Sequence, residues 1–164
     1  MALHEQCVGA TDEWYTPPHV FEALGTEFSV DVASPGAEIT PWIPARRFIK
    51  VDSLGRDWSD FGFIWMNPPF GGRNSIVPWL KKFFAHCNGV ALTPDRTSAP
   101  WWQDFARKAD AVLFVAPRIK FIGVGGAPGE SPAQGTSLLA LGDRGVAALR
   151  RAAYKGLGTL LVPA

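Results

Sequence analysis

Short apolar stretches alternate along this chain with turn-rich and amphipathic ones, which is the pattern of strands and helices that follow one another. The pattern predicts strands over 28–33, 47–51, 62–66, 89–93 and 111–116, and helices over 18–24, 75–86 and 100–109. Proline opens the first of these helices and Gly25 closes it. We therefore expect an α/β fold with a mostly parallel central sheet and helices on both faces.

The C-terminal third has a less regular pattern. Residues 122–136 are rich in glycine and proline, which predicts a mobile surface loop. Residues 137–141 and 159–162 are predicted to be closing strands. Between them we expect a helix over 144–154 that Asp143 caps.

Length and composition are those of one compact domain. The chain has 164 residues, of which 47% are hydrophobic and 19% charged, so we expect residues 1–164 to form a single domain without a separate target-recognition domain. With a net charge of +1, any binding of nucleic acid must depend on a local cluster of cations. Cys7 and Cys87 have no metal-ligand spacing, and no stretch resembles a leader or a membrane span. These features favour a cytoplasmic protein without a metal site.

The predicted strand 62–66 leads directly into the loop Asn67-Pro68-Pro69-Phe70. An exocyclic amine conjugated with a ring, as in adenine, is a poor nucleophile, and two hydrogen-bond acceptors aimed at its NH2 group make it a better one. The side-chain oxygen of Asn67 and the main-chain carbonyl of Pro68 can serve as that pair, and consecutive prolines hold them in place. Phe70 can stack on a base. Asn-Pro-Pro is also an ordinary turn sequence, and its place directly after a buried-looking strand is what favours the chemical role.

Several motifs occur in order with this loop. They are Glu13-Trp14-Tyr15-Thr16-Pro17-Pro18, Asp31-Val32-Ala33-Ser34, Asp57-Trp58, Trp65-Met66-Asn67-Pro68-Pro69-Phe70-Gly71, Pro94-Asp95-Arg96-Thr97 and Arg118-Ile119-Lys120-Phe121. In this order and spacing, over nearly the whole chain, the sequence resembles the phage-type DNA N-6-adenine methyltransferases, a branch of the Rossmann-like enzymes that use S-adenosylmethionine (SAM). The resemblance implies methylation of adenine N6 in DNA, with Asn67, Pro68, Pro69 and Phe70 as catalytic residues, in the cytoplasm of a bacterial host if a phage encodes the chain.

The resemblance also implies where the cofactor binds. Asp31 is expected to accept a hydrogen bond from the methionine ammonium of SAM, and Thr16 to lie against its carboxylate. Asp52 is expected at the adenosine. Trp14, Tyr15 and Ala33 complete the cofactor set. A turn aspartate at Asp31, a helix cap at Thr16 and a solvated turn at Asp52 are the structural alternatives.

The cations expected to contact DNA are Arg96, Arg118 and Lys120, the last two on one face of a short strand. Trp101 and Trp102 are adjacent on a predicted helix, so one is expected in the core. The last predicted helix is basic, through Arg144, Arg150, Arg151 and Lys155, and we interpret this as a solvated face.

The sequence departs from larger methyltransferases in two ways. Only Ser34-Pro35-Gly36 stands where they have a glycine-rich turn, and Phe70 stands where tyrosine is commoner. Related Asn-Pro-Pro loops also act on RNA bases or on a protein glutamine. A non-catalytic DNA-binding protein with the same fold is a third alternative.

Overall fold

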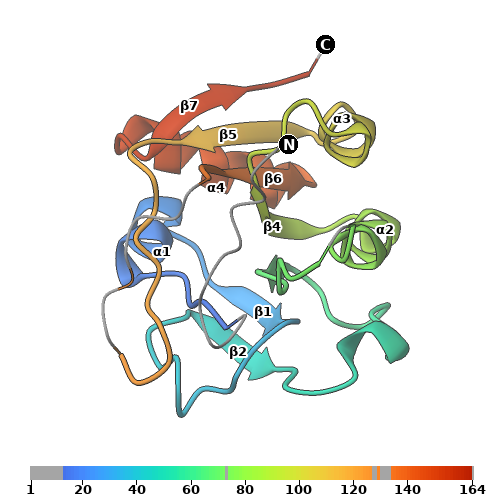
Figure 1. Cartoon of the computed structure of the whole chain (residues 1–164), viewed down its shortest axis with the longest axis vertical. Helices are drawn as coiled ribbons and strands as arrows, with labels where there is room; N and C mark the ends of the chain where they lie inside the picture. Colours follow the sequence, from blue (N-terminus) through green and yellow to red (C-terminus); the bar gives the residue numbers. More distant parts are fainter. Residues whose placement is uncertain (1–12, 73, 127–128, 130–133, 164) are drawn as a thin grey trace, which may run out of the picture.

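The computed structural model describes residues 13–163 except 73, 127–128 and 130–133. These residues form a seven-stranded sheet in the order β2-β1-β3-β4-β6-β5-β7 (Figure 1). The strands are β1 (Phe28–Asp31), β2 (Ala45–Phe48), β3 (Ile64–Met66), β4 (Gly89–Pro94), β5 (Ala111–Val115), β6 (Thr136–Leu141) and β7 (Gly158–Leu161). The helices are α1 (Pro18–Leu24), α2 (Val77–His86), α3 (Pro100–Ala106) and α4 (Asp143–Tyr154), with one 3-10 turn, η1 (Ser53–Gly55).

The sheet is mixed, so the expectation of a mostly parallel sheet is only partly met. β1 pairs in parallel with β2 and β3, and β3 pairs in parallel with β4. β6 is antiparallel to both β4 and β5, and β7 is antiparallel to β5. The chain leaves β5 and enters β6 at the same edge of the sheet, which reverses its direction, whereas a parallel pair needs a crossover to the opposite edge.

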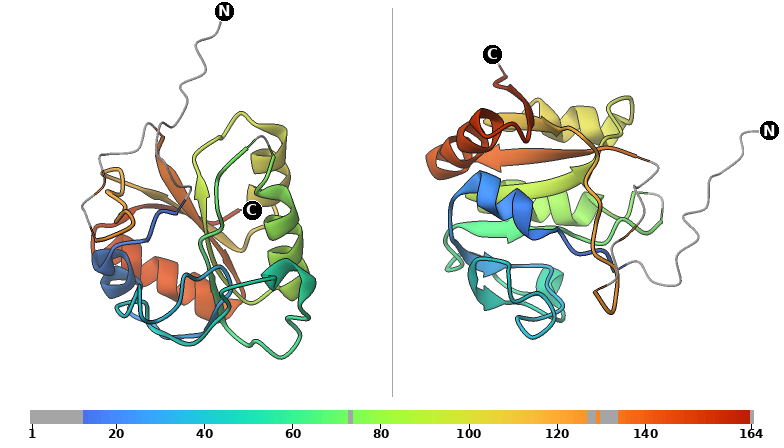
Figure 2. Two further views of the ribbon diagram at one scale, coloured as in Figure 1. Left: turned by 60° about the horizontal axis from the view of Figure 1, so that its bottom comes forward. Right: turned by 90° about the vertical axis from the view of Figure 1, so that its left-hand side faces the viewer.

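Helices cover both faces of the sheet, as expected. Apolar residues of α1 and α4 belong to the core on one face, and those of α2 and α3 belong to the core on the other. Figure 2 shows the two helix pairs on opposite sides of the strands. On the α3 side, Trp102 is buried and stacks on Phe114, while Trp101 is half-buried against the same core.

Most predicted elements are present with shifted ends. The helix 18–24 is confirmed, and Gly25 ends it in the left-handed conformation. Asp143 does not cap α4: it is the first residue of the helix, and Gly142 takes the N-cap position without a side-chain cap. In the predicted loop 122–136, Ile122 pairs with Tyr15 and Thr136 already belongs to β6, and part of this loop lies outside the described residues.

The basic side chains of α4 mainly hold the helix in place. Arg144 donates a hydrogen bond to the Glu27 carbonyl at 2.6 Å, and Arg151 donates to the Leu24 carbonyl at 3.0 Å. Lys155 Nζ donates to the carbonyl of Glu22 at 2.7 Å. These bonds satisfy carbonyls in and after the last turn of α1, so three cations of this exposed, solvated face also hold α4 against α1.

In the part of the chain that the structure describes, no helix is both long enough and apolar enough to cross a membrane.

Candidate active site at the carboxyl edge of the sheet

The strand order reverses between β1 and β3. From β1 the chain moves outward to β2, and from β3 it moves in the opposite direction to β4. In open α/β sheets, ligands bind outside the carboxyl ends of the strands at such a switch point. Asp31 ends β1 and pairs with Trp65, and Asn67 directly follows β3. The two residues that the sequence singled out most strongly therefore flank the switch point.

The amide of Asn67 is fixed by the segment that precedes α1. Its Nδ2 donates hydrogen bonds to the Trp14 carbonyl at 3.0 Å and to Thr16 Oγ1 at 3.1 Å. A main-chain carbonyl can only accept, so the NH2 group of the amide must face it. Among the described residues, none donates a hydrogen bond to Asn67 Oδ1 or to the carbonyl of Pro68. The two acceptors that the loop was expected to present are thus both unoccupied within the described chain.

Thr16 is fully buried and is held from two sides. Its carbonyl accepts a hydrogen bond from Trp42 Nε1 at 2.8 Å, and its hydroxyl accepts the bond from Asn67. The alternative role as a helix cap is wrong, because Pro17 is the N-cap of α1 and no side chain caps it. Tyr15 is anchored next to it through paired backbone hydrogen bonds with Ile122 at 2.8 and 2.9 Å.

The Tyr15 side chain is buried and its hydroxyl donates to Glu13 Oε2 at 2.9 Å. Burial raises the pKa of Tyr15, and the carboxylate of Glu13 adds to this. Trp14 is exposed beside it, so its carbonyl, and not its ring, makes the contact with Asn67.

The carboxyl group of Asp31 is 1% exposed. It accepts hydrogen bonds from the Ala33 N–H at 3.2 Å and from the Ser34 hydroxyl. Burial raises the pKa of Asp31 to about 7, although those two hydrogen bonds act to lower it. No lysine or arginine among the described residues forms an ion pair with it. These two bonds are those of a turn aspartate, so the turn alternative is also met, and the carboxyl group is nevertheless almost completely buried.

The two prolines of the loop differ in exposure. Pro68 is buried and Pro69 is exposed. Phe70 is half-buried and packs against the apolar cores on both faces of the sheet. Its ring therefore has a structural contact as well as an accessible part.

Two other predicted site residues lie in exposed turns. Asp52 has a positive φ of 53° directly before η1, and its side chain caps nothing. An exposed turn is compatible with both the adenosine contact and the solvated-turn alternative. Arg96 is exposed after β4, and its Nε donates to Gln134 Oε1 at 3.1 Å. Ala33 is half-buried after β1.

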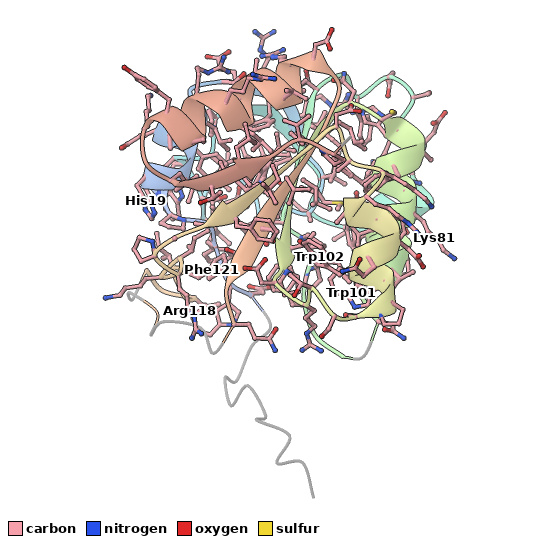
Figure 3. All side chains as sticks on the ribbon, turned by 90° about the horizontal axis from the view of Figure 1, so that it is seen from above. His19, Lys81, Trp101, Trp102, Arg118 and Phe121 are labelled. Atoms are coloured by element: carbon pink, nitrogen blue, oxygen red, sulfur yellow. The ribbon has the colours of Figure 1, made fainter. Side chains whose placement is uncertain are left out.

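Arg118 and Lys120 do not lie on a strand, which corrects the prediction. The segment after β5 is irregular, and its ladder is limited to the bridge between Ile122 and Tyr15. The alternation of the side chains is nevertheless real, because Ile119 and Phe121 are buried while Arg118 and Lys120 are exposed. Figure 3 shows Arg118 and Phe121 on the opposite side of the sheet from Trp101 and Trp102.

Nothing in the sequence singled out Trp42 or Ser137, and Asp95 stood in the motif Pro94-Asp95-Arg96-Thr97 without a role of its own. Trp42 stands in the proline-rich stretch Thr40-Pro41-Trp42-Ile43-Pro44, which looked like an ordinary loop. The Ser137 hydroxyl donates a hydrogen bond to the Asp95 carboxylate across the β4–β6 edge. A tryptophan between two prolines is a weak signal for such a contact, since prolines restrict where the ring can point.

No group of metal-ligating side chains was found in the described residues, and Cys87 is a free, exposed thiol. Cys7 lies outside the described residues.

The loop Asn67-Pro68-Pro69-Phe70 thus lies at the switch point of the sheet, with the amide of Asn67 held by the segment before α1. A family model described as DNA N-6-adenine-methyltransferase (Dam) matches residues 5–144. The chain belongs to this family and is an adenine-specific DNA methyltransferase that acts on N6. No curated protein and no solved structure matches the chain significantly.

Proposed function

We propose that the chain methylates N6 of adenine in DNA by holding the amine between Asn67 Oδ1 and the carbonyl of Pro68, with SAM as the methyl donor. One observation carries this proposal. The hydrogen bonds from Asn67 Nδ2 to the Trp14 carbonyl and Thr16 Oγ1 set the orientation of the amide, so that Oδ1 is left to accept from a substrate.

The role of these acceptors follows from the chemistry of the amine. Two hydrogen bonds from its N–H groups favour a tetrahedral nitrogen whose lone pair is no longer delocalised into the ring. The nitrogen can then form a bond to the methyl carbon while the bond from that carbon to the sulfonium sulfur breaks, and the methylated amine afterwards releases one proton to solvent. Because Asn67 is held before the substrate arrives, no reorganisation of the acceptor is needed during the reaction.

Asp31 has the chemistry to hold the cofactor. When bound, SAM supplies a methyl group activated by its sulfonium. The buried carboxyl of Asp31 lacks a cationic partner among the described residues, which suits the ammonium of the cofactor. Since Asp31 is almost completely covered, the ammonium can reach it only if the covering chain shifts. Thr16 and Ala33 lie next to Asn67 and Asp31 and belong to the proposed cofactor site with Trp14, Tyr15 and Asp52.

Phe70 is proposed to stack on the target base. A base in a duplex must be flipped out before its amine can enter a pocket, and an aromatic face stabilises the flipped base. The half-buried position of Phe70, three residues after Asn67, supports this role. Arg96, Arg118 and Lys120 are proposed to contact DNA.

We further propose that the fold is Rossmann-like and forms a single methyltransferase domain. The switch point between β1 and β3 supports the first statement, although β6 and β7 depart from a parallel arrangement.

Other substrates would fit the loop chemistry, but nothing favours them. An RNA base or a protein glutamine presents a similar amine, and a non-catalytic DNA-binding protein would need no acceptor pair. The family match names DNA and adenine, and the acceptor pair is intact.

The test is incubation of the purified protein with tritiated SAM and unmethylated duplex DNA, followed by nucleoside analysis. We expect the label in N6-methyladenine, with roughly a hundredfold less incorporated by the Asn67→Ala variant over the same short time. Label in another nucleoside, in RNA offered in parallel, or in no product would overturn the proposal.

A further inference from the structure

A basic pocket lies beside the active site, on the face of the sheet that α1 and α4 cover. It has a volume of about 810 Å³ and lies between the start of α1, the segment after β5 and the end of α4. Three cations and one histidine line it, against one acidic residue: Arg118, Lys120, Lys155 and His19, against Glu22. In a chain with a formal net charge of only +1, this is a local concentration of positive charge.

Two cations of the basic pocket, Arg118 and Lys120, belong to a segment that is fixed to the rest of the fold. Ile119 and Phe121 alternate with Arg118 and Lys120 and are 1% and 5% exposed in the core. The next residue, Ile122, is fixed to Tyr15 by two backbone hydrogen bonds. Because the apolar neighbours are buried, the two cationic side chains are exposed, and Figure 3 shows Arg118 pointing outward.

The segment before α1, which is paired with Ile122, connects the pocket to the catalytic loop. Tyr15, which anchors Ile122, is followed by Thr16, which contacts Asn67, and then by Pro17, which lines the pocket. On the far wall, Lys155 donates to the Glu22 carbonyl and keeps two N–H groups for other acceptors. The pocket therefore begins one residue from a side chain that holds Asn67.

We propose that the basic pocket binds phosphates of duplex DNA next to the flipped adenine. Phosphate is the part of DNA that cations recognise without reading sequence, and such contacts fix the register of a protein on the duplex. This inference rests on the proposed function, since it takes the base at Asn67 as its reference point. In this proposal, Arg118 and Lys120 contact the DNA backbone from one wall of the pocket, and Lys155 contacts it from the opposite wall.

The test compares two double variants in binding to unmethylated duplex DNA over a series of salt concentrations. Arg118→Gln with Lys120→Gln removes two cations of the pocket. Lys81→Gln with Lys108→Gln is the matched control, because it removes two exposed cations from the opposite face. We expect the pocket variant to bind more weakly at low salt. We also expect its plot of log affinity against log salt to be shallower by about 2, since each lost phosphate contact reduces the slope by about 0.9. The control should keep the parental slope.

Equal slopes for the pocket variant and the parent, or equal losses in both double variants, would overturn the pocket proposal. Methylation by the parent together with an unchanged slope in the pocket variant would overturn the pocket alone. A shallower slope in the pocket variant, with no methylation of adenine by the parent, would support the pocket and overturn the proposed function.

Discussion

Asn67 Nδ2 lies 3.1 Å from Thr16 Oγ1, so a hydroxyl 51 positions away in the sequence helps to orient the amide of the catalytic loop. If this contact positions Asn67, Thr16→Val should lower kcat about fivefold, the effect of losing one buried hydrogen bond worth about 1 kcal/mol. Thr16→Ser keeps the hydroxyl and should restore most of the rate. The measurement is single-turnover methylation of duplex DNA.

The control for Thr16 is Thr159→Val, which makes the same change on the exposed edge of β7. If Thr16 contributed only to stability, its valine variant would lose folded protein without a change in the rate per folded molecule. That result, read from the melting temperature together with the rate, would contradict the positioning role.

The raised pKa of Asp31 predicts a pH-dependent stability. Its ordinary value is 3.8 and burial raises it to about 7, so the folded protein binds more protons than the unfolded chain between these values. This contribution to stability is complete below about pH 4 and is lost as the pH rises to about 7, a change on the order of 4 kcal/mol. Asp31→Asn cannot ionise and should therefore stabilise the ligand-free protein at pH 8 but not at pH 4.

Denaturant unfolding at both pH values measures this effect, with Asp60→Asn as an exposed control. The same Asp31→Asn variant should bind SAM much more weakly by calorimetry, because it lacks a charge for the ammonium. Parental affinity in this variant would mean that the cofactor is held elsewhere.

Phe70 has two contacts that substitution can separate. Phe70→Ala should cost about 1 to 3 kcal/mol in binding of the flipped base and should also lower stability, because the ring packs on both cores. Phe70→Leu should restore most of the stability but not the base binding, and Phe70→Tyr should keep both. Affinity for duplex DNA and the melting temperature check the two effects, and full DNA affinity in Phe70→Leu would exclude stacking.

Two adjacent arginines of α4 offer a matched pair. Arg151 donates to the Leu24 carbonyl at 3.0 Å, whereas the side chain of Arg150 is exposed and makes no hydrogen bond with the described residues. Arg151→Ala should lower the free energy of unfolding by about 1 kcal/mol, and Arg150→Ala should change it little. Denaturant unfolding of both variants is the check, and equal losses would mean that the contact with α1 adds nothing.

Local patterns were enough to predict where most elements lie. The proline and glycine that bound α1 act within the helix itself, and the apolar run before Asn67 is a buried central strand. The direction of β6 and β7 could not be predicted, because pairing partners are chosen by contacts far apart in the sequence. Aspartate is a common N-cap residue, which is why Asp143 was expected to cap α4. The N-cap position is instead taken by Gly142, and the helix begins at Asp143.

The candidate site could also be predicted only as far as it depends on local sequence. The loop at Asn67 and the acid at Asp31 have types and positions that follow from strand ends, whereas the bonds to Thr16 and Trp42 depend on how separate segments pack. The near-complete burial of Asp31 also has no local signature, since it requires chain from elsewhere in the fold to cover it.

The most direct measurement of the central claim is the single-turnover rate of adenine methylation in duplex DNA by Asn67→Ala, at saturating SAM. The Asn67 side chain supplies one of the two preorganised acceptors, and losing one such group costs on the order of 3 kcal/mol in the barrier. We expect a rate roughly a hundredfold lower, with SAM affinity unchanged. Methylation of adenine at the parental rate by this variant would contradict the account, because the loop would then be only a turn.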